Sequence, residues 1–310
     1  MNEMKGNCLA VFNSNDIYPV SADSELPFEQ HRDIFHLSGI DQEETILLLY
    51  PPSKDDKTRE ILFIRKSDNH TKVWEGEKLS KKQANELSGI DNIYYIEDFK
   101  AVLSSIATKV DTFYINKNEH YRANSPVETR EDRFISWLLK KYPAHNVAKS
   151  NPILQRQRSI KHPHEIDQIK RACEITKKGF NRVLKFIKPD VWEYEIEAEF
   201  IHEFINNSSK GFAYSPIIAS GHDNNVLHYI KNNKQCKSGE LVLMDVGAEY
   251  GNYSSDMTRT VPVSGKFSKR QKEIYNAVLR VKNESTKLLT VGNNWKLFHE
   301  QVGEIMTKQL

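Results

Sequence analysis

The stretch Leu241-Val-Leu-Met-Asp-Val-Gly-Ala-Glu-Tyr-Gly-Asn-Tyr-Ser-Ser-Asp-Met-Thr-Arg-Thr260 decides how the rest of the chain is interpreted. An apolar run ends at Asp245, and Asp256 opens a second strand-like run. The Gly, Asn and Ser residues between them suit a hairpin, which would bring both carboxylates to one end of a sheet. A carboxylate at the end of an apolar strand is costly unless a partner compensates its charge. Two converging oxygen ligands favour a divalent cation, and a shared carboxylate suits a pair of cations. The alternative is an unrelated α/β protein whose aspartates merely cap turns.

Around this segment the second half of the chain alternates helices with short strands. His162 and Pro163 begin an amphipathic helix that Pro189 ends, and residues 192–206 form a second helix. Residues 215–220, 241–245 and 257–263 are predicted strands separated by turns rich in Gly, Asn and Ser. Ser268 is the N-cap of a helix over 269–289. These elements predict an α+β domain.

The first 150 residues have the pattern of an α/β layer domain. Apolar runs at 45–50, 61–64 and 112–115 are predicted strands, and residues 80–87, 95–108 and 133–141 have helical spacing. A turn-rich break at 142–146 and 151–152 precedes the basic stretch 155–161. We therefore expect an N-terminal domain over 1–155 and a second domain over 156–310.

Composition excludes several classes of protein. The 310 residues carry a formal net charge of +2, and 38% of them are hydrophobic. A near-neutral charge gives no reason to expect nucleic acid as a partner, and no apolar run reaches the ~20 residues of a membrane span. The three cysteines have no CxxC spacing and the N-terminus has no apolar leader, so we expect a cytoplasmic protein.

The quoted segment resembles a motif of the pita-bread metallopeptidases, in the aminopeptidase P and Xaa-Pro dipeptidase (prolidase) branch. The matching residues are Asp245-Val-Gly247, Tyr250-Gly251 and Asp256-Met-Thr-Arg-Thr260. The resemblance implies that the second domain is the N-terminal half of a pita-bread catalytic domain. It also implies that Asp245 is the ligand of one metal ion and that Asp256 bridges two.

Further stretches carry the same resemblance, which spans roughly residues 15–310. Ser220-Gly221 and Leu227-His228-Tyr229 are similar to the family's Ser-Gly and Leu-His-Tyr stretch, and this implies a catalytic role for His228, expected on a strand. His228 and Tyr229 would then line the substrate pocket. Thr258 and Arg259 would contact the metal ligands without binding the metal themselves. For Arg259 the alternative is an ordinary structural ion pair. Ser21-Ala-Asp-Ser-Glu25 and Trp74-Glu-Gly76 are similar to the N-terminal domain of aminopeptidase P.

The family's site needs one further His and two Glu ligands, which we expect beyond residue 310. His299, Glu300 and Glu304 lie on a helical pattern without a second His at HExxH spacing, as do His202 and Glu203, so we interpret both groups as solvated helix faces. His222 is expected in a loop near the pocket. A chain with two of five ligands is expected to be inactive, and to be truncated at its C-terminus.

The resemblance implies a metal-dependent exopeptidase that releases the first residue of peptides with proline in second position. It implies two divalent cations, Mn²⁺ by preference, and a homo-oligomer. Two alternatives remain: a non-catalytic pita-bread module that binds peptides, and a Xaa-Pro dipeptidase restricted to dipeptides.

Overall fold

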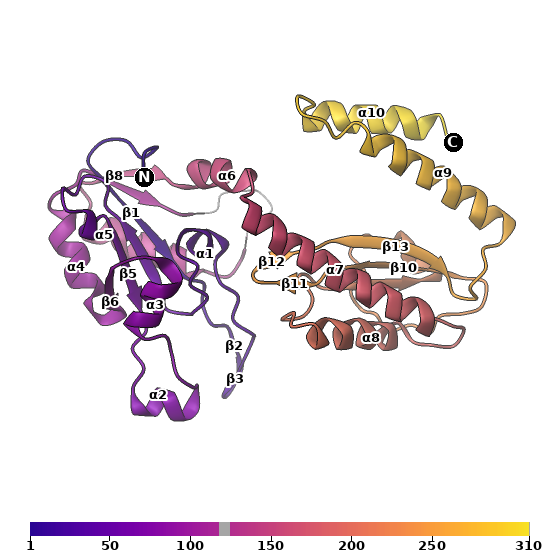
Figure 1. The fold of residues 1–310 in the computed structure, drawn as a ribbon, viewed down its shortest axis with the longest axis horizontal. Coiled ribbons are helices and arrows are strands. Elements are labelled where there is room, and N and C mark those ends of the chain that lie inside the picture. The colour runs from indigo at the N-terminus through magenta and orange to yellow at the C-terminus, as the bar shows by residue number, and fades with distance from the viewer. Residues whose placement is uncertain (118–124, 310) are drawn as a thin grey trace. The chain divides into compact units, whose positions relative to one another are not determined.

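The computed structural model describes residues 1–117 and 125–309, and the chain divides into two compact units, Met1–Lys161 and His162–Leu310 (Figure 1). Each unit buries its own apolar clusters.

A mixed six-stranded sheet forms the centre of the first unit. Its strand order is β6-β5-β4-β1-β7-β8. The strands are β1 (Cys8–Asn13), β4 (Ile46–Leu49), β5 (Glu60–Ile64), β6 (Asn92–Tyr95), β7 (Thr112–Ile115) and β8 (Asn146–Lys149). β1, β7 and β8 run parallel, whereas β4 is antiparallel to both of its neighbours, β1 and β5.

Every residue of β1 is buried, and successive side chains of a strand point to opposite faces of the sheet. Both faces of this sheet are therefore covered, and helices provide the cover. One face packs against α4 (Phe99–Ala107) and α5 (Arg130–Lys141), and Leu9 and Val11 belong to that cluster. The other face packs against α1 (Arg32–Ser38), α3 (Lys81–Ser88) and α6 (Asn151–Ser159), and it holds Ala10 and Phe12. The α/β layer architecture expected from the sequence is confirmed.

Two local predictions for the first unit were wrong. The turn-rich break at 151–152 is the start of helix α6, because Pro152 occupies the first turn of a helix, where its missing N–H costs nothing. The predicted helix over 95–108 begins later, at Phe99, because Tyr95 still belongs to β6 and a 3₁₀ turn (Ile96–Asp98) intervenes. The central strand β1 was not predicted at all.

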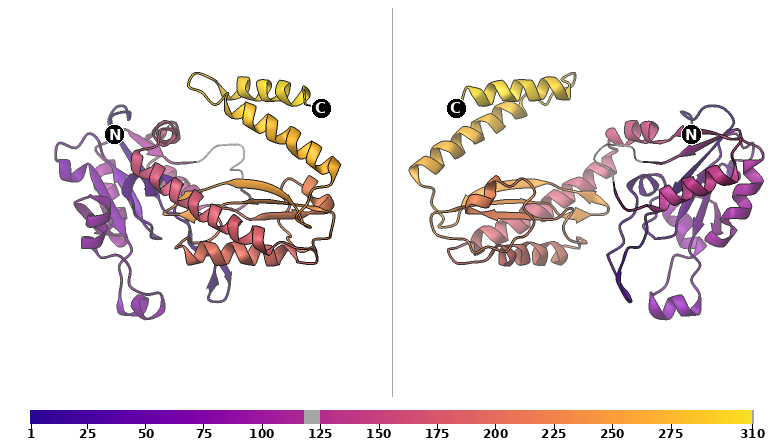
Figure 2. Two further views of the ribbon diagram at one scale, coloured as in Figure 1. Left: turned by 45° about the vertical axis from the view of Figure 1, so that its right-hand side comes forward. Right: turned by 180° about the vertical axis from the view of Figure 1, so that it is seen from behind.

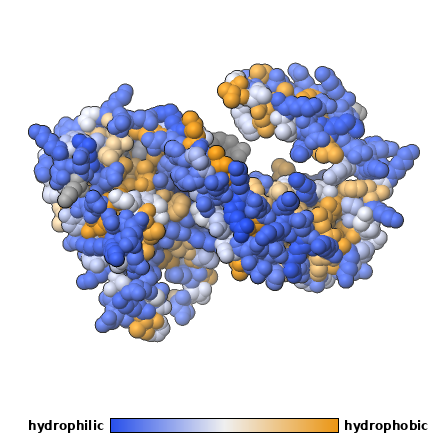
Figure 3. Space-filling view, viewed as in Figure 1, coloured by the Kyte–Doolittle hydropathy of each residue, from blue (hydrophilic) through white to orange (hydrophobic). Residues whose placement is uncertain are grey.

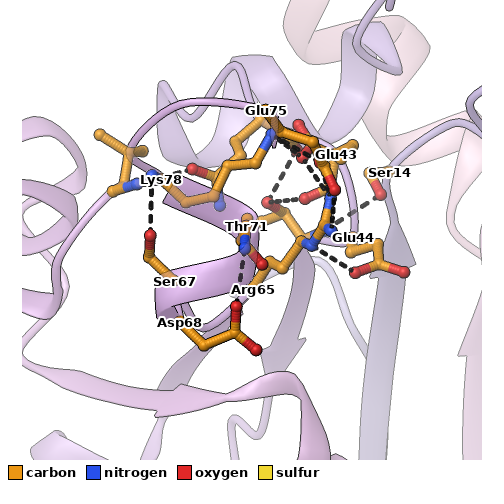
Figure 4. Close-up of polar contacts among 12 residues, drawn as sticks. Ser14, Glu43, Glu44, Arg65, Ser67, Asp68, Thr71, Glu75 and Lys78 are labelled. Atoms are coloured by element: carbon orange, nitrogen blue, oxygen red, sulfur yellow. Dashed lines mark hydrogen bonds and ion pairs between the residues drawn. The ribbon is translucent and has the colours of Figure 1, made fainter. Parts of the chain in front are cut away.

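A charged cluster ties the α2 segment to the rest of the first unit (Figure 4). The helix α2 (Asn69–Trp74) is capped by Asp68, and Glu75 follows it. Arg65 donates to both carboxylate oxygens of Glu75, at 2.6 and 2.7 Å, and to Glu43 at 3.1 Å. These bonds hold the pKa of the Glu75 carboxyl below its ordinary value. Trp74 nevertheless stays 76% exposed, and apolar colour shows at the tip that carries α2 in Figure 3.

A three-stranded antiparallel sheet forms the centre of the second unit, in the order β13-β10-β9. The strands are β9 (Ile217–Ser220), β10 (Leu241–Val246) and β13 (Met257–Pro262). Two long helices, α7 (Pro163–Phe186) and α8 (Glu193–Asn206), pack against one of its faces (Figure 2). The helices predicted from 163, 192 and 269 and the strands predicted at 215–220, 241–245 and 257–263 are present, so the α+β character is confirmed.

Close helix packing explains the register of α7 against α8. Gly179 of α7 has no side chain, and a Cβ atom there would lie 2.8 Å from ring atoms of both Phe200 and Phe204. The two rings fill the space that the glycine leaves, and both are fully buried. A single residue type therefore fixes how closely these helices approach.

After β13 the chain forms a helical hairpin, α9 (Lys269–Thr286) followed by α10 (Trp295–Thr307), which turns back beside it (Figures 1 and 2). Ser268 caps α9 as predicted, with its side chain accepting from the Gln271 N–H. Among the residues that the structure describes, no helix combines the length and the apolar character that a bilayer crossing needs.

Candidate metal centre

The two predicted metal ligands stand at the same end of neighbouring strands. Asp245 is the fifth residue of β10, and Asp256 directly precedes β13, which pairs with β10 in antiparallel register. The intervening chain forms a small hairpin of β11 (Glu249–Tyr250) and β12 (Tyr253–Ser254). Gly251 and Asn252 at its tip both have positive φ, 57° and 67°, as a two-residue hairpin turn requires. The predicted hairpin therefore exists and brings the aspartates together.

A tyrosine hydroxyl marks the point on which the two carboxylates converge. Tyr214 donates to Asp245 Oδ1 at 2.5 Å, and its hydroxyl oxygen lies 3.2 Å from Asp256 Oδ1. Tyr214 is 31 residues before Asp245 in the sequence and precedes β9. Sequence analysis did not identify it, because nothing in the local pattern distinguishes it from any other tyrosine next to a strand.

At this point two carboxylates, those of Asp245 and Asp256, face a single hydrogen-bond donor, the Tyr214 hydroxyl. Burial, followed by the hydrogen bond to Asp245, raises the pKa of the Tyr214 hydroxyl far above its ordinary value. Asp245 is partly buried and Asp256 is exposed. Two carboxylates that share one proton donor retain free lone pairs, and hard cations bind such oxygens. The chemistry of these oxygens therefore fits a divalent cation, and the role of Asp245 and Asp256 as its ligands stays a prediction.

The residues expected behind these ligands have different surroundings. Thr258 pairs with Asp245 across the β10–β13 ladder, so their side chains share one face of the sheet. Arg259 is exposed, and its guanidinium donates to the carbonyl of Thr258 at 2.7 Å. Among the residues that the structure describes, Arg259 forms no ion pair with a carboxylate, so its expected role beside the metal site stays a prediction.

Of the two residues expected to line the substrate pocket, His228 is exposed and Tyr229 is buried. His228 lies in an exposed turn, not on a strand as expected, because residues 226–231 form the connection that follows the 3₁₀ helix Gly221–Asn225. Tyr229 is only 7% exposed, and its hydroxyl donates to Glu193 at 2.7 Å. Burial raises the pKa of the Tyr229 hydroxyl, and the hydrogen bond to Glu193 raises it further. Tyr229 therefore anchors the turn that presents His228.

Glu193 is the buried acceptor that organises this turn. Its carboxylate is fully buried and accepts hydrogen bonds from both the N–H and the hydroxyl of Ser220, at 2.7 Å each, and from the Lys234 N–H at 3.0 Å. Four donors, counting Tyr229, satisfy a charge that would otherwise be costly to bury. Sequence analysis did not identify this residue, since a glutamate at the start of a helix is common.

The other candidate ligands do not join the carboxylate pair. In residues 1–117 and 125–309 no group of three His, Cys, Asp or Glu side chains is placed to hold a metal ion. His299, Glu300 and Glu304 lie on α10, and His202 and Glu203 on α8, as expected of helix faces. His222 lies in the 3₁₀ helix Gly221–Asn225 and is exposed.

Comparison with known proteins identifies the families that the two parts of the chain resemble. Residues 167–310 match the model of metallopeptidase family M24, and residues 1–114 match the aminopeptidase P N-terminal domain. The Xaa-Pro aminopeptidase of Haemophilus influenzae is 32% identical over 93% of this chain. Human Xaa-Pro aminopeptidase 3 is 29% identical over 96% of it. The chain spans 64% and 58% of the length of these two relatives.

Solved structures are similar over nearly the whole chain. A zinc-substituted Escherichia coli aminopeptidase P in complex with product matches 99% of this chain with a TM-score of 0.88 and 30% identity, and the chain covers 70% of that protein. Pseudomonas aeruginosa aminopeptidase PepP matches with the same TM-score at 27% identity. The fold expected from the resemblance, including the pita-bread character of the second unit, is confirmed.

Proposed function

This chain belongs to the aminopeptidase P branch of metallopeptidase family M24, and from that premise we propose that it supplies the first part of a metal-dependent Xaa-Pro aminopeptidase site. The proposed reaction is hydrolysis of the bond between the first residue of a peptide and a following proline. The observation that carries the proposal is the convergence of Asp245 and Asp256 on the Tyr214 hydroxyl. The relatives bear the names of aminopeptidases, which favours this function over a dipeptidase or a binding module.

We propose that Asp245 and Asp256 hold divalent cations, with manganese as the working metal. A bound divalent cation lowers the pKa of coordinated water and polarises a carbonyl group. We propose Asp256 as the shared carboxylate, and its exposure at the open end of the hairpin supports this assignment. Tyr214 keeps the two acids oriented toward one point.

We propose that His228 acts on the peptide and that neighbouring residues hold its turn in position. The His228 turn is exposed, so its imidazole is accessible to a peptide and could donate to the carbonyl oxygen that gains charge. Tyr229 and Glu193 fix the position of that turn. The substrate, the two-cation stoichiometry, the homo-oligomeric state and a cytoplasmic location belong to the proposal. The unpaired state of all three cysteines supports that location.

A metal-binding experiment tests the proposal. We expect the 310-residue chain to bind Mn²⁺ weakly, since two carboxylates make an incomplete cage, and we expect no turnover of Ala-Pro-Ala. Asp245→Ala and Asp256→Ala should each abolish saturable Mn²⁺ binding measured by water-proton relaxation. The matched control is Asp167→Ala, an exposed acid on α7.

Three results would contradict the proposal or part of it. Retention of saturable binding in Asp245→Ala would show that the cation lies elsewhere. A loss of binding in Asp167→Ala as large as in Asp245→Ala would reduce the effect to net charge. Measurable turnover by this chain would contradict the expectation that further ligands are needed.

A further inference from the structure

A buried threonine of α7 contacts the chain on both sides of the proposed metal ligands. Thr176 is fully buried, and its hydroxyl oxygen lies 2.7 Å from Ser255 Oγ. It also accepts a hydrogen bond from the Ala248 N–H at 2.8 Å. Ser255 directly precedes Asp256, and Ala248 lies three residues after Asp245. One side chain from a distant helix therefore reaches both arms of the ligand hairpin.

The hydrogen bonds among Thr176, Ala248 and Ser255 give each donor an acceptor. Ser255 donates its hydroxyl proton to the Ala248 carbonyl at 3.0 Å, so its oxygen is left to accept from Thr176. The Ala248 N–H is shared between two acceptors, Thr176 Oγ1 at 2.8 Å and Ser255 Oγ at 3.0 Å, and the Ser255 N–H donates to the Ala248 carbonyl at 3.0 Å. A buried network in which every donor has an acceptor has one favoured geometry. We call these three residues the hydroxyl clamp.

Backbone contact at Gly247 makes the clamp tight. A Cβ atom at this position would lie 1.8 Å from the Ser255 carbonyl oxygen, which no side chain could tolerate. The two arms of the hairpin therefore touch at the residue that follows β10. Since Gly247 lies two residues after Asp245, any opening of this contact moves one ligand away from the other.

We propose that Thr176 is a positioning residue for the metal centre, which it controls by fixing Asp256 against Asp245 through Ser255 and Ala248. The inference rests on the proposed function, because it concerns the same pair of ligands. Its physical reason is that a cation site tolerates small errors of ligand placement poorly, so groups outside the ligand shell set the affinity. Thr176 touches neither a carboxylate nor a substrate; it acts through its neighbours.

The test compares three variants of the full chain. Thr176→Val keeps the shape of the side chain and removes the hydroxyl, whereas Thr176→Ser keeps the hydroxyl and removes a methyl group. Phe180→Leu, one helical turn along α7, disturbs the same buried core without touching the clamp. Mn²⁺ affinity is measured by water-proton relaxation under conditions where circular dichroism shows each variant to be folded.

We expect Thr176→Val to weaken Mn²⁺ binding by about tenfold, the lower end of the effect of groups that orient metal ligands. Thr176→Ser should restore affinity to nearly the level of the unsubstituted chain, and Phe180→Leu should leave it unchanged. Amide hydrogen exchange at Ala248 and Ser255 should speed up in Thr176→Val alone. That readout reports the clamp itself without any metal.

Failure of this inference and failure of the proposed function give different results. Undiminished affinity in folded Thr176→Val, or an equal loss in Phe180→Leu, overturns the positioning role. If the unsubstituted chain and Asp245→Ala bind Mn²⁺ alike, the proposed function fails instead. In that case amide exchange still decides on the clamp: unchanged protection of Ser255 in Thr176→Val overturns it.

Discussion

At the scale of single residues, the site depends on polar side chains that lie far apart in the sequence. Tyr214, Asp245 and Asp256 come from three segments, and the Tyr214 hydroxyl is their meeting point. Glu193 has the corresponding role for the His228 turn, through Tyr229. In both places a tyrosine hydroxyl donates to a carboxylate: at Tyr214 the carboxylates are the proposed ligands themselves, and at Tyr229 the bond anchors the turn that carries His228.

Removing the Tyr214 hydroxyl tests whether it stabilises the two neighbouring carboxylates when no cation is bound. We expect Tyr214→Phe to lower the free energy of unfolding of the metal-free chain by about 1–2 kcal/mol, because Asp245 loses its donor while two acids remain close together. Saturating Mn²⁺ should reduce this difference, since the cation takes over the compensation of charge. Urea unfolding with and without Mn²⁺ measures both values.

The control for this experiment is Tyr229→Phe, which removes a hydroxyl from another carboxylate in the same unit. Its destabilisation should not depend on Mn²⁺. A Tyr214→Phe effect that is equally independent of the metal would separate this tyrosine from the proposed site.

At the scale of elements, the second unit depends on how closely α7 approaches its neighbours. The helix supplies Gly179 to the contact with α8 and Thr176 to the contact with the ligand hairpin, within one turn. The two residues lie on neighbouring parts of the same buried face, so the position of α7 sets both the core and the clamp.

A pair of glycine substitutions separates close packing from helix propensity. Gly179→Ala places a methyl group 2.8 Å from two phenylalanine rings, so we expect a loss of about 1–3 kcal/mol in the free energy of unfolding. Gly303→Ala lies on α10 with open space around the new Cβ, and we expect a gain of about 0.5–1 kcal/mol. Thermal unfolding followed by circular dichroism measures both. A stabilising Gly179→Ala would mean that the helices can separate at little cost.

At the scale of the whole molecule, the chain contains two units with separate apolar cores. The first encloses its six-stranded sheet between helices, and the second packs α7 and α8 on a three-stranded sheet. We propose that the division between Lys161 and His162 is also a boundary of independent folding.

Expression of residues 1–161 alone tests this boundary. Both faces of its sheet are covered by helices from the same segment, so we expect a folded domain with one cooperative unfolding transition. Urea unfolding followed by Trp137 fluorescence, with the other tryptophans replaced by phenylalanine in both chains, gives a midpoint that should be the same in the fragment and in the 310-residue chain. A fragment that lacks a cooperative transition would show that the first unit needs the second.

Elements with local signals could be predicted from the amino-acid sequence alone. The apolar runs of β4, β5, β7 and β10, the cap of α9, and the hairpin between Asp245 and Asp256 follow from side-chain periodicity and turn chemistry. The family motif lies within one hairpin, so it could be identified without knowing the rest of the fold. The helix α6 and the true start of α4 were missed, because proline and tyrosine have more than one local meaning.

Contacts between side chains that are distant in the sequence could not be predicted in this way. Tyr214 at the carboxylates, Glu193 under Tyr229 and Thr176 behind Ser255 are ordinary residues in their own segments, joined across 31 to 79 positions of chain. The physical reason is that periodicity records which face of an element is buried, whereas a hydrogen bond between elements depends on their relative register and depth. That register is set by packing, as at Gly179 and Gly247, and it exists only in the folded chain.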